Sequence, residues 1–119
     1  MALRPQPRLD PRERHVAIPS PAASLELFLR HLPPEIPRAD GPRVVLYVHG
    51  GTFASGLSIA HRFDGRSWRD DLCALGFDVW GFDFLGFGAS DRFPEMGEPA
   101  DRHGPLGQAE DASRQIERW

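Results

Sequence analysis

Uninterrupted hydrophobic residues mark one short segment of the chain, the run Val-Val-Leu-Tyr-Val at 44–48. The run is too short and too rich in β-branched residues for a helix, and it lacks the alternation of a strand with one solvent-exposed face. The sequence therefore predicts a strand over 43–48 that is buried on both faces, as in a parallel sheet covered by helices. The strand stops at His49-Gly50-Gly51, where glycine allows a sharp turn that exposes backbone N–H groups at the carboxyl end of the strand.

Leucines at alternate positions predict a second strand nearer the N-terminus, over residues 25–30. Residues 15–18 are apolar enough for a short strand before it, and the Pro-Ser-Pro sequence at 19–21 separates the two. Together they predict an antiparallel hairpin. Residues 33–42 are rich in proline and predict a rigid connection without regular structure.

A helical period appears after the loop that follows the two glycines. Within residues 65–75, Trp68, Leu72 and Leu75 are spaced i, i+4, i+7 and share one face of a helix. Residues 77–83 then predict another strand. A hydrophobic strand, a crossover helix and a second strand form a βαβ unit, whose connection is right-handed almost without exception.

The remaining residues predict irregular structure and one more helix. Residues 1–13 are rich in proline and arginine and predict a flexible arm ahead of a domain over 14–119. Residues 84–107 contain many glycines and prolines and predict a long surface excursion. Residues 108–119 have a helical pattern with no terminator, so a helix is expected to continue to the last residue.

Composition narrows the classes of protein that fit. At 119 residues the chain holds at most one domain, and 40% hydrophobic with 26% charged residues is ordinary for a soluble globular protein. The net charge of −3, with arginines scattered among carboxylates, gives no reason to expect a nucleic-acid partner. The longest apolar stretch is too short to span a membrane. The lone Cys73 excludes an internal disulfide framework and favours the reducing cytoplasm as the expected location.

A second motif follows the strand predicted at 77–83. It reads Asp-Phe-Leu-Gly-Phe-Gly-Ala-Ser over residues 83–90. The order hairpin, strand, His-Gly-Gly, helix, strand and then this motif resembles the N-terminal part of α/β-hydrolase-fold enzymes. These include esterases, lipases, proline iminopeptidases, epoxide hydrolases and haloalkane dehalogenases. The resemblance covers roughly residues 14–119 and implies an α/β fold: an N-terminal hairpin plus the βαβ portion of a hydrolase sheet that is incomplete. The family commonly has Arg or Pro where this chain has Leu85.

The resemblance also implies roles for particular residues. The N–H of Gly51 would form part of an oxyanion hole, with Thr52 as a second donor. The alternative for the His-Gly-Gly turn is purely conformational, because a tight turn favours glycine. The remaining residues of the two motifs would be structural: His49 as a hydrogen-bonding group, and the others as a brace for the floor of the site. These others are Gly50, Asp83, Gly86, Gly88 and Ser90.

The catalytic groups of the family are absent from the chain. In family order the nucleophile comes first, then the acid and then the histidine, and all three are expected beyond Trp119. A complete protein would attack a small-molecule ester, amide or related substrate by nucleophilic catalysis with Ser or Asp. This chain is then an N-terminal fragment, predicted to be inactive alone. The alternative is a non-catalytic binding or interaction module that retains the βαβ core.

Other candidates for chemistry are weaker. Ser58 lies in Gly-Leu-Ser-Ile-Ala, which resembles a nucleophile elbow but lacks the preceding strand and the following helix. The glycines at 86 and 88 lack the third glycine of a dinucleotide fingerprint, so no cofactor is expected. His61 and His103 lie in separate loops without metal-ligand spacing, and no metal is expected. Cys73 has no basic neighbour that would activate it and is interpreted as an inert buried thiol.

Overall fold

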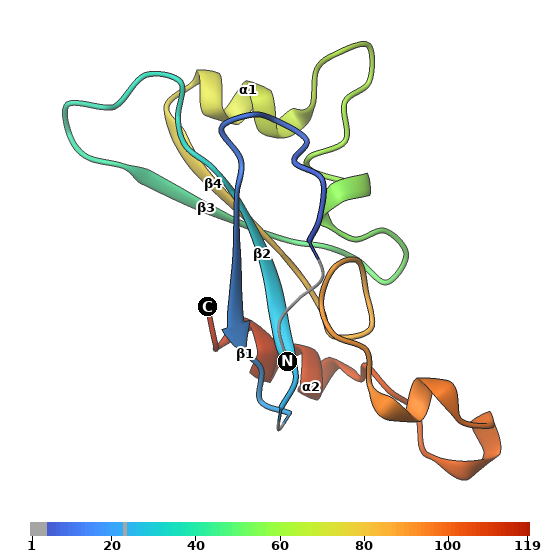
Figure 1. Ribbon diagram of the computed structural model, residues 1–119. Helices are drawn as coiled ribbons and strands as arrows, with labels where there is room; N and C mark the ends of the chain where they lie inside the picture. Colours follow the sequence, from blue (N-terminus) through green and yellow to red (C-terminus); the bar gives the residue numbers. More distant parts are fainter. Residues whose placement is uncertain (1–4, 23) are drawn as a thin grey trace.

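A mixed β-sheet forms the centre of the molecule (Figure 1). The computed structural model describes residues 5–22 and 24–119, which form four strands and two α-helices. The strands are β1 (Arg14–Pro19), β2 (Glu26–Leu32), β3 (Arg43–Val48) and β4 (Phe77–Asp83), and the helices are α1 (Trp68–Ala74) and α2 (Ala109–Ile116). The strand order is β1-β2-β4-β3. The mixed α/β character of the prediction is confirmed.

The predicted hairpin and βαβ unit are both present. Strands β1 and β2 pair antiparallel, with Ala17 opposite Phe28. Strands β3 and β4 pair parallel, with α1 in the connection between them, and β4 also pairs antiparallel with β2. The parallel pair brings the carboxyl ends of β3 and β4 to the same edge of the sheet, and this edge holds both glycine motifs.

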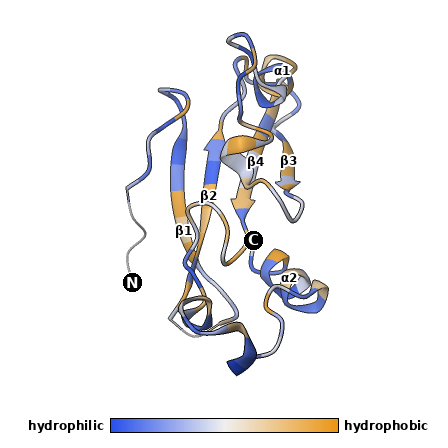
Figure 2. Cartoon of the chain, turned by 90° about the vertical axis from the view of Figure 1, so that its right-hand side faces the viewer, coloured by the Kyte–Doolittle hydropathy of each residue, from blue (hydrophilic) through white to orange (hydrophobic). Residues whose placement is uncertain are grey.

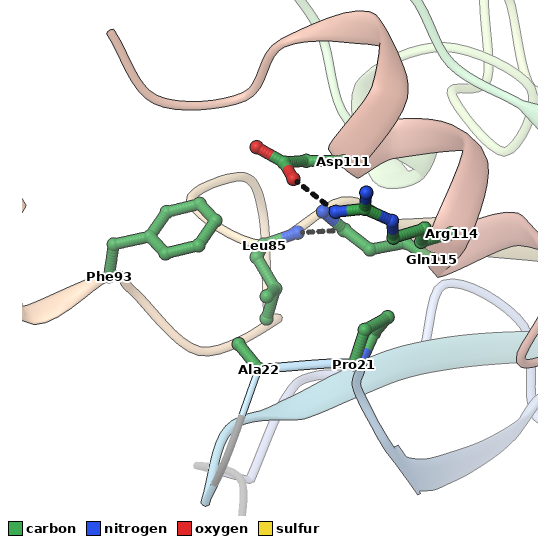
Figure 3. Close-up of a pocket in the computed structure, with 7 residues that line it drawn as sticks. All are labelled: Pro21, Ala22, Leu85, Phe93, Asp111, Arg114 and Gln115. Carbon is green, nitrogen blue, oxygen red and sulfur yellow. Dashed lines mark hydrogen bonds and ion pairs between the residues drawn. The ribbon is translucent and has the colours of Figure 1, made fainter. Parts of the chain in front are cut away.

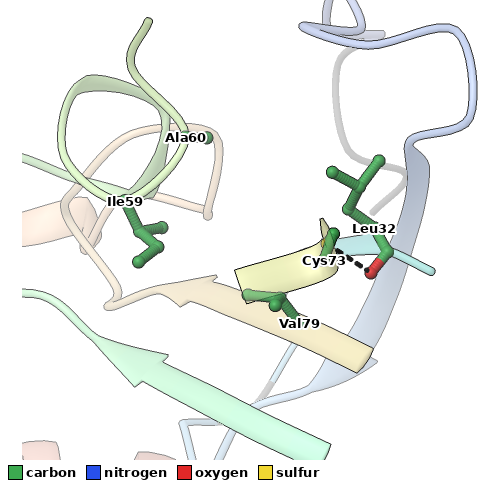
Figure 4. Close-up of a cluster of buried hydrophobic side chains, with 5 residues drawn as sticks. All are labelled: Leu32, Ile59, Ala60, Cys73 and Val79. Atoms are coloured by element: carbon green, nitrogen blue, oxygen red, sulfur yellow. Dashed lines mark hydrogen bonds between the residues drawn. The ribbon is translucent and has the colours of Figure 1, made fainter. Parts of the chain in front are cut away.

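Apolar side chains cover both faces of the sheet. On one face a buried cluster lies between α1, the loop after β3 and strands β2 and β4 (Figure 4). Its members are Leu32, Ile59, Ala60, Cys73 and Val79. On the other face Leu27, Leu29, Phe82 and Leu85 form a second cluster, against which Ile116 of α2 packs. Figure 2 shows that β2 changes from apolar to polar along its length, whereas β3 is apolar along most of its own.

Strand β3 is not buried on both faces, so that part of the prediction is wrong. Val44 is 50% exposed and Val48 is 40% exposed. The physical reason is position: β3 lies at the end of the strand order and, within the described chain, pairs only with β4. A continuous apolar run indicated burial, but it did not indicate which side of the strand would be covered.

Both helices differ from their predicted bounds, and only part of the apolar face predicted for α1 is buried. Helix α1 begins at Trp68, where Ser67 and Asp70 form a capping box. Its buried residues are Arg69, Asp70 and Cys73. Of the predicted apolar face, Leu72 packs against the buried cluster of the core, while Trp68 and Leu75 are exposed. Helix α2 ends at Ile116, before the last residue. Among the described helices, none has the length and apolarity needed to cross a membrane.

Candidate functional site

The two glycine motifs lie side by side at one edge of the sheet. Val48, the last residue of β3, is paired with Phe82 of β4. The His-Gly-Gly turn therefore leaves β3 next to the point where the second motif leaves β4 (Figure 1). Carboxyl ends of parallel strands are where open α/β sheets place their ligands. The candidate site is therefore the set of contacts at this edge.

His49 connects the two strand ends. It is 3% exposed, and its Nε2 accepts the N–H of Phe84 at 3.0 Å. Nδ1 then carries the proton and donates to the carbonyl oxygen of Gly50 at 2.5 Å. The ring also meets Phe84 edge-on, with centroids 4.9 Å apart. Both ring nitrogens are occupied, so His49 is a structural hydrogen-bonding group in this arrangement.

Backbone donors are free in the segment that follows His49. From Gly50 to Ala54, no N–H donates to an acceptor among the described residues. Gly51 and Thr52 are exposed, so their N–H groups are available to a ligand. A Cβ on Gly50 or Gly51 would touch nothing within 4 Å, and neither residue has a left-handed φ. The conformation of the turn therefore does not require glycine at these two positions.

Asp83 holds the far end of the same segment. It is 1% exposed, and its Oδ1 accepts the N–H and the hydroxyl of Ser55 at 2.9 and 2.6 Å. Its Oδ2 accepts the N–H of Ala89 at 3.0 Å. Gly88 makes this contact possible, because a Cβ there would lie 2.2 Å from Oδ2 and its φ is +51°. Asp83 is thus a carboxylate that fixes two turns, and no contact presents it as an acid or a metal ligand.

Ser90 and Gly86 complete the second motif. The hydroxyl of Ser90 donates to the carbonyl oxygen of Asp83 and accepts the N–H of Phe28 at 2.8 Å. Gly86 has a φ of +87°, and its N–H donates to the carbonyl of Asp91 at 2.9 Å. The motif therefore ties the end of β4 to the start of β2, and neither of these residues is free for chemistry.

A cluster of buried charges lies beneath the site, and sequence reasoning missed it. Glu13 is 1% exposed and contacts Arg30 and Arg69 at 2.7 and 2.6 Å, and Arg30 Nε donates to the hydroxyl of Ser55 at 2.9 Å. Burial favours a higher pKa for Glu13, but the bond from His15 and the charges of the two arginines outweigh it, so the pKa is lowered. Burial lowers the pKa of Arg30 despite the carboxylate beside it. The local signal was Arg30, which follows the apolar run Leu-Phe-Leu in β2.

The other sequence candidates lie outside this arrangement. The hydroxyl of Ser58 donates to the carbonyl of Ala54 at 2.8 Å, and the residue follows a 3₁₀ turn rather than a strand. His103 is bonded to the carbonyl of Gly104, and His61 meets Phe63 edge-on. Burial raises the pKa of the Cys73 thiol to about 11. In residues 5–22 and 24–119 no group of three or more metal-ligating side chains could hold an ion.

A separate hollow of about 180 Å³ lies between α2, the turn after β1 and the loop after β4 (Figure 3). Its polar groups are committed to the fold: Gln115 Oε1 accepts the N–H of Leu85 at 2.8 Å, and Arg114 pairs with Asp111 at 3.3 Å. The rest of its lining is apolar, from Pro21, Ala22, Leu85 and Phe93. This hollow is a junction between helix and loop and does not join the site at the ends of β3 and β4.

Comparisons with known proteins found no relative. No family model matches the chain, and neither a curated protein nor a solved structure matches it.

Proposed function

We propose that this chain supplies the oxyanion-stabilising part of an α/β-hydrolase-type enzyme. Such an enzyme attacks a small-molecule ester, amide or related electrophile with a Ser or Asp nucleophile. The nucleophile, acid and histidine would come from residues outside this chain. The observation that carries the proposal is the run of free N–H donors from Gly50 to Ala54, held next to β4 at the carboxyl end of β3.

The chemistry follows from the way negative charge develops during attack on a carbonyl. As the nucleophile adds, the carbonyl oxygen becomes an oxyanion, and fixed donors about 2.7–3.1 Å from that oxygen stabilise the transition state. Gly51 and Thr52 offer two adjacent exposed N–H groups for this purpose. Because no Cβ stands at Gly51, a substrate has room to approach its N–H closely.

The rest of the site supports the donors rather than reacting. His49 binds the start of the segment to Phe84, and Asp83 binds its end through Ser55. Donors that are fixed before the reaction need no rearrangement when charge appears, which is why preorganised hydrogen bonds are worth more than those of solvent. The strand pairing agrees with the family's sheet order, in which the strand at 43–48 lies beside the strand at 77–83.

A titration of this chain with phenylphosphonate, a tetrahedral anion, tests the proposal. We expect millimolar additions to shift the backbone amide signals of Gly51 and Thr52 in ¹⁵N-labelled protein. Gly51→Ala keeps the N–H and meets open space, so it should retain the shifts. Gly51→Pro deletes one donor and should weaken them. Equal shifts in a folded proline variant, or shifts centred elsewhere, would contradict the assignment. In an enzyme that contains this segment, loss of one such donor should lower kcat by about 10²–10³.

A second candidate is a non-catalytic interaction module that retains the βαβ core. The exposed side chains of β3 favour it, since Val44 and Val48 are 50% and 40% exposed on an edge strand. A stable monomer by circular dichroism and sedimentation, with no amide shifts in the phosphonate titration, would favour this alternative. The cytoplasmic location expected from the lone cysteine remains part of the proposal for either function.

A further inference from the structure

Two contacts join the ends of the free-donor segment to consecutive residues of β4 and its extension. At the start, His49 Nε2 accepts the N–H of Phe84 at 3.0 Å. At the end, the N–H and hydroxyl of Ser55 donate to Asp83 at 2.9 and 2.6 Å. Between them, residues 50–54 have no hydrogen bond from their own N–H groups to the described chain. The two end contacts are therefore the hydrogen bonds that link this segment to β4 and its extension, while its other bonds, at the carbonyl oxygens of Gly50 and Ala54, come from nearby residues of the described chain.

Two further buried side chains, Arg30 and Glu13, continue the hydrogen-bond chain from Ser55. The Ser55 hydroxyl, which gives its proton to Asp83, accepts Arg30 Nε at 2.9 Å. Arg30 in turn donates from its Nη1 to Glu13 at 2.7 Å. Ser55 is fully buried, and Arg30 and Glu13 are 6% and 1% exposed. A continuous buried path thus leads from Glu13, ahead of β1, to the end of the segment that holds the oxyanion donors.

Glu13 also compensates the charges of the buried arginines in this path. The buried charged groups near Ser55 are the cations of Arg30 and Arg69 and the carboxylates of Glu13 and Asp83. Glu13 contacts both arginines, so its removal leaves two buried guanidinium groups with Asp83 as the only remaining carboxylate of the cluster. The field on Asp83 and the orientation of Arg30 both change, and Ser55 hydrogen-bonds to each of them.

We infer that Glu13 is a positioning residue for the oxyanion segment, acting through Arg30 and Ser55. Its functional meaning rests on the proposed function, but the positioning itself is a property of this chain. This inference assigns a role to Glu13, which belongs to the segment that the sequence predicts to be a flexible arm. Within that segment Asp10 is also buried, yet it pairs with Arg62 at 2.7 Å and has no contact with Ser55.

The test measures backbone mobility of the segment by ¹⁵N relaxation on the whole chain. In the wild type we expect order parameters of about 0.85 for residues 50–55, as in rigid backbone. Glu13→Gln keeps the size of the side chain and removes its charge, and we expect values for residues 50–54 to fall toward about 0.6. Asp10→Asn is the matched control, because it neutralises a second buried carboxylate of the same segment and should leave residues 50–54 rigid.

A second variant keeps the test decisive if Glu13→Gln fails to fold. Ser55→Ala leaves every charge in place and deletes only the hydroxyl that joins Arg30 to Asp83, so the same increase in mobility is expected. Ser20→Ala is its control, since Ser20 is a buried serine whose hydroxyl bonds within the turn between β1 and β2. Unchanged order parameters at 50–54 in Ser55→Ala, or in folded Glu13→Gln, would overturn the inference.

The two proposals fail in different ways. If the segment becomes mobile in both variants while phenylphosphonate never shifts the amide of Gly51, the positioning stands and the oxyanion function is wrong. If phenylphosphonate binds at Gly51 with equal affinity in the wild type and in Ser55→Ala, and mobility is unchanged, the oxyanion function stands and the role of Glu13 is wrong.

Discussion

Replacing Gly88 with alanine is expected to lower the free energy of unfolding more than any other single glycine-to-alanine change at the site. Gly88 has a φ of +51°, and an added Cβ would lie 2.2 Å from Asp83 Oδ2 and 2.7 Å from the Cβ of Ala54. The Asp83 carboxylate cannot move aside freely, because it holds Ser55 and the N–H of Ala89. The new methyl group therefore competes with a hydrogen-bonded carboxylate and a packed side chain.

Two effects set the magnitude. A left-handed φ costs an alanine about 1–2 kcal/mol relative to glycine. Forcing a methyl group into a filled space typically costs about 1–3 kcal/mol more. The two together give about 2–5 kcal/mol, which is a large part of the roughly 5–15 kcal/mol that stabilises a typical domain. Gly86→Ala also has a left-handed φ, but its nearest contact is the flexible Met96 sulfur at 3.2 Å, so only the smaller first effect is expected.

Urea unfolding followed by circular dichroism measures the difference. Gly97→Ala is the control, since a Cβ there meets nothing and its φ is not left-handed. The expected order of stability is Gly97→Ala above Gly86→Ala above Gly88→Ala, with unchanged m-values. If Gly88→Ala unfolds at the same urea concentration as Gly97→Ala, the close packing of Asp83 against this turn is wrong, and with it the geometry proposed for the site.

Three further predictions concern activity, association and acid stability. The chain alone should show no saturable turnover of p-nitrophenyl acetate or butyrate, and turnover that Ser58→Ala abolishes would contradict this. The exposed edge of β3 should cause concentration-dependent association in sedimentation. Val44→Lys should reduce this association, and Leu75→Lys, at an exposed leucine outside β3, should not; a monodisperse wild-type monomer would refute the prediction. Hydrogen bonds from Arg62 lower the pKa of Asp70 below its ordinary 3.8. Its contribution to stability is therefore present above pH 3.8 and is lost as pH falls below that value, and Asp70→Asn should flatten the dependence of the urea midpoint on pH in this range.

Local patterns were sufficient to predict the elements that position the site. Alternating leucines predicted β2, and the bounds of β4 follow directly from the apolar segment at 77–83. Helix α1 ends before Gly76, whose φ is left-handed, and it begins at a capping box. Both are signals of four or five residues, but the predicted range 65–75 did not use the capping box and so began before Trp68. Patterns of this length can be recognised in one sequence because all the interacting groups lie within one turn of each other.

The buried charge cluster could not be predicted in the same way. Glu13, Arg30, Ser55 and Asp83 lie far apart in the chain, and their contacts form only when β2, β4 and the loop after β3 are assembled. A charged residue such as Arg30, directly after an apolar run, indicates that a partner exists, because an unpaired buried charge is too costly. It does not indicate which of the 17 acidic residues is the partner. The identity of Glu13 is therefore tertiary information.

The glycines of the site differ in whether the fold itself requires them. Gly88 is explained by its backbone angle and by the carboxylate beside it, so nothing about a ligand follows from its presence. Gly50 and Gly51 have neither reason: their φ angles suit any residue, and a Cβ would enter open space. Conformation alone would tolerate a larger residue at these two positions, and a side chain longer than the methyl group of alanine would shield the free N–H groups of the segment. The absence of a structural requirement at Gly51 is consistent with the proposed donor role, which the comparison of Gly51→Ala with Gly51→Pro tests because only proline deletes the N–H.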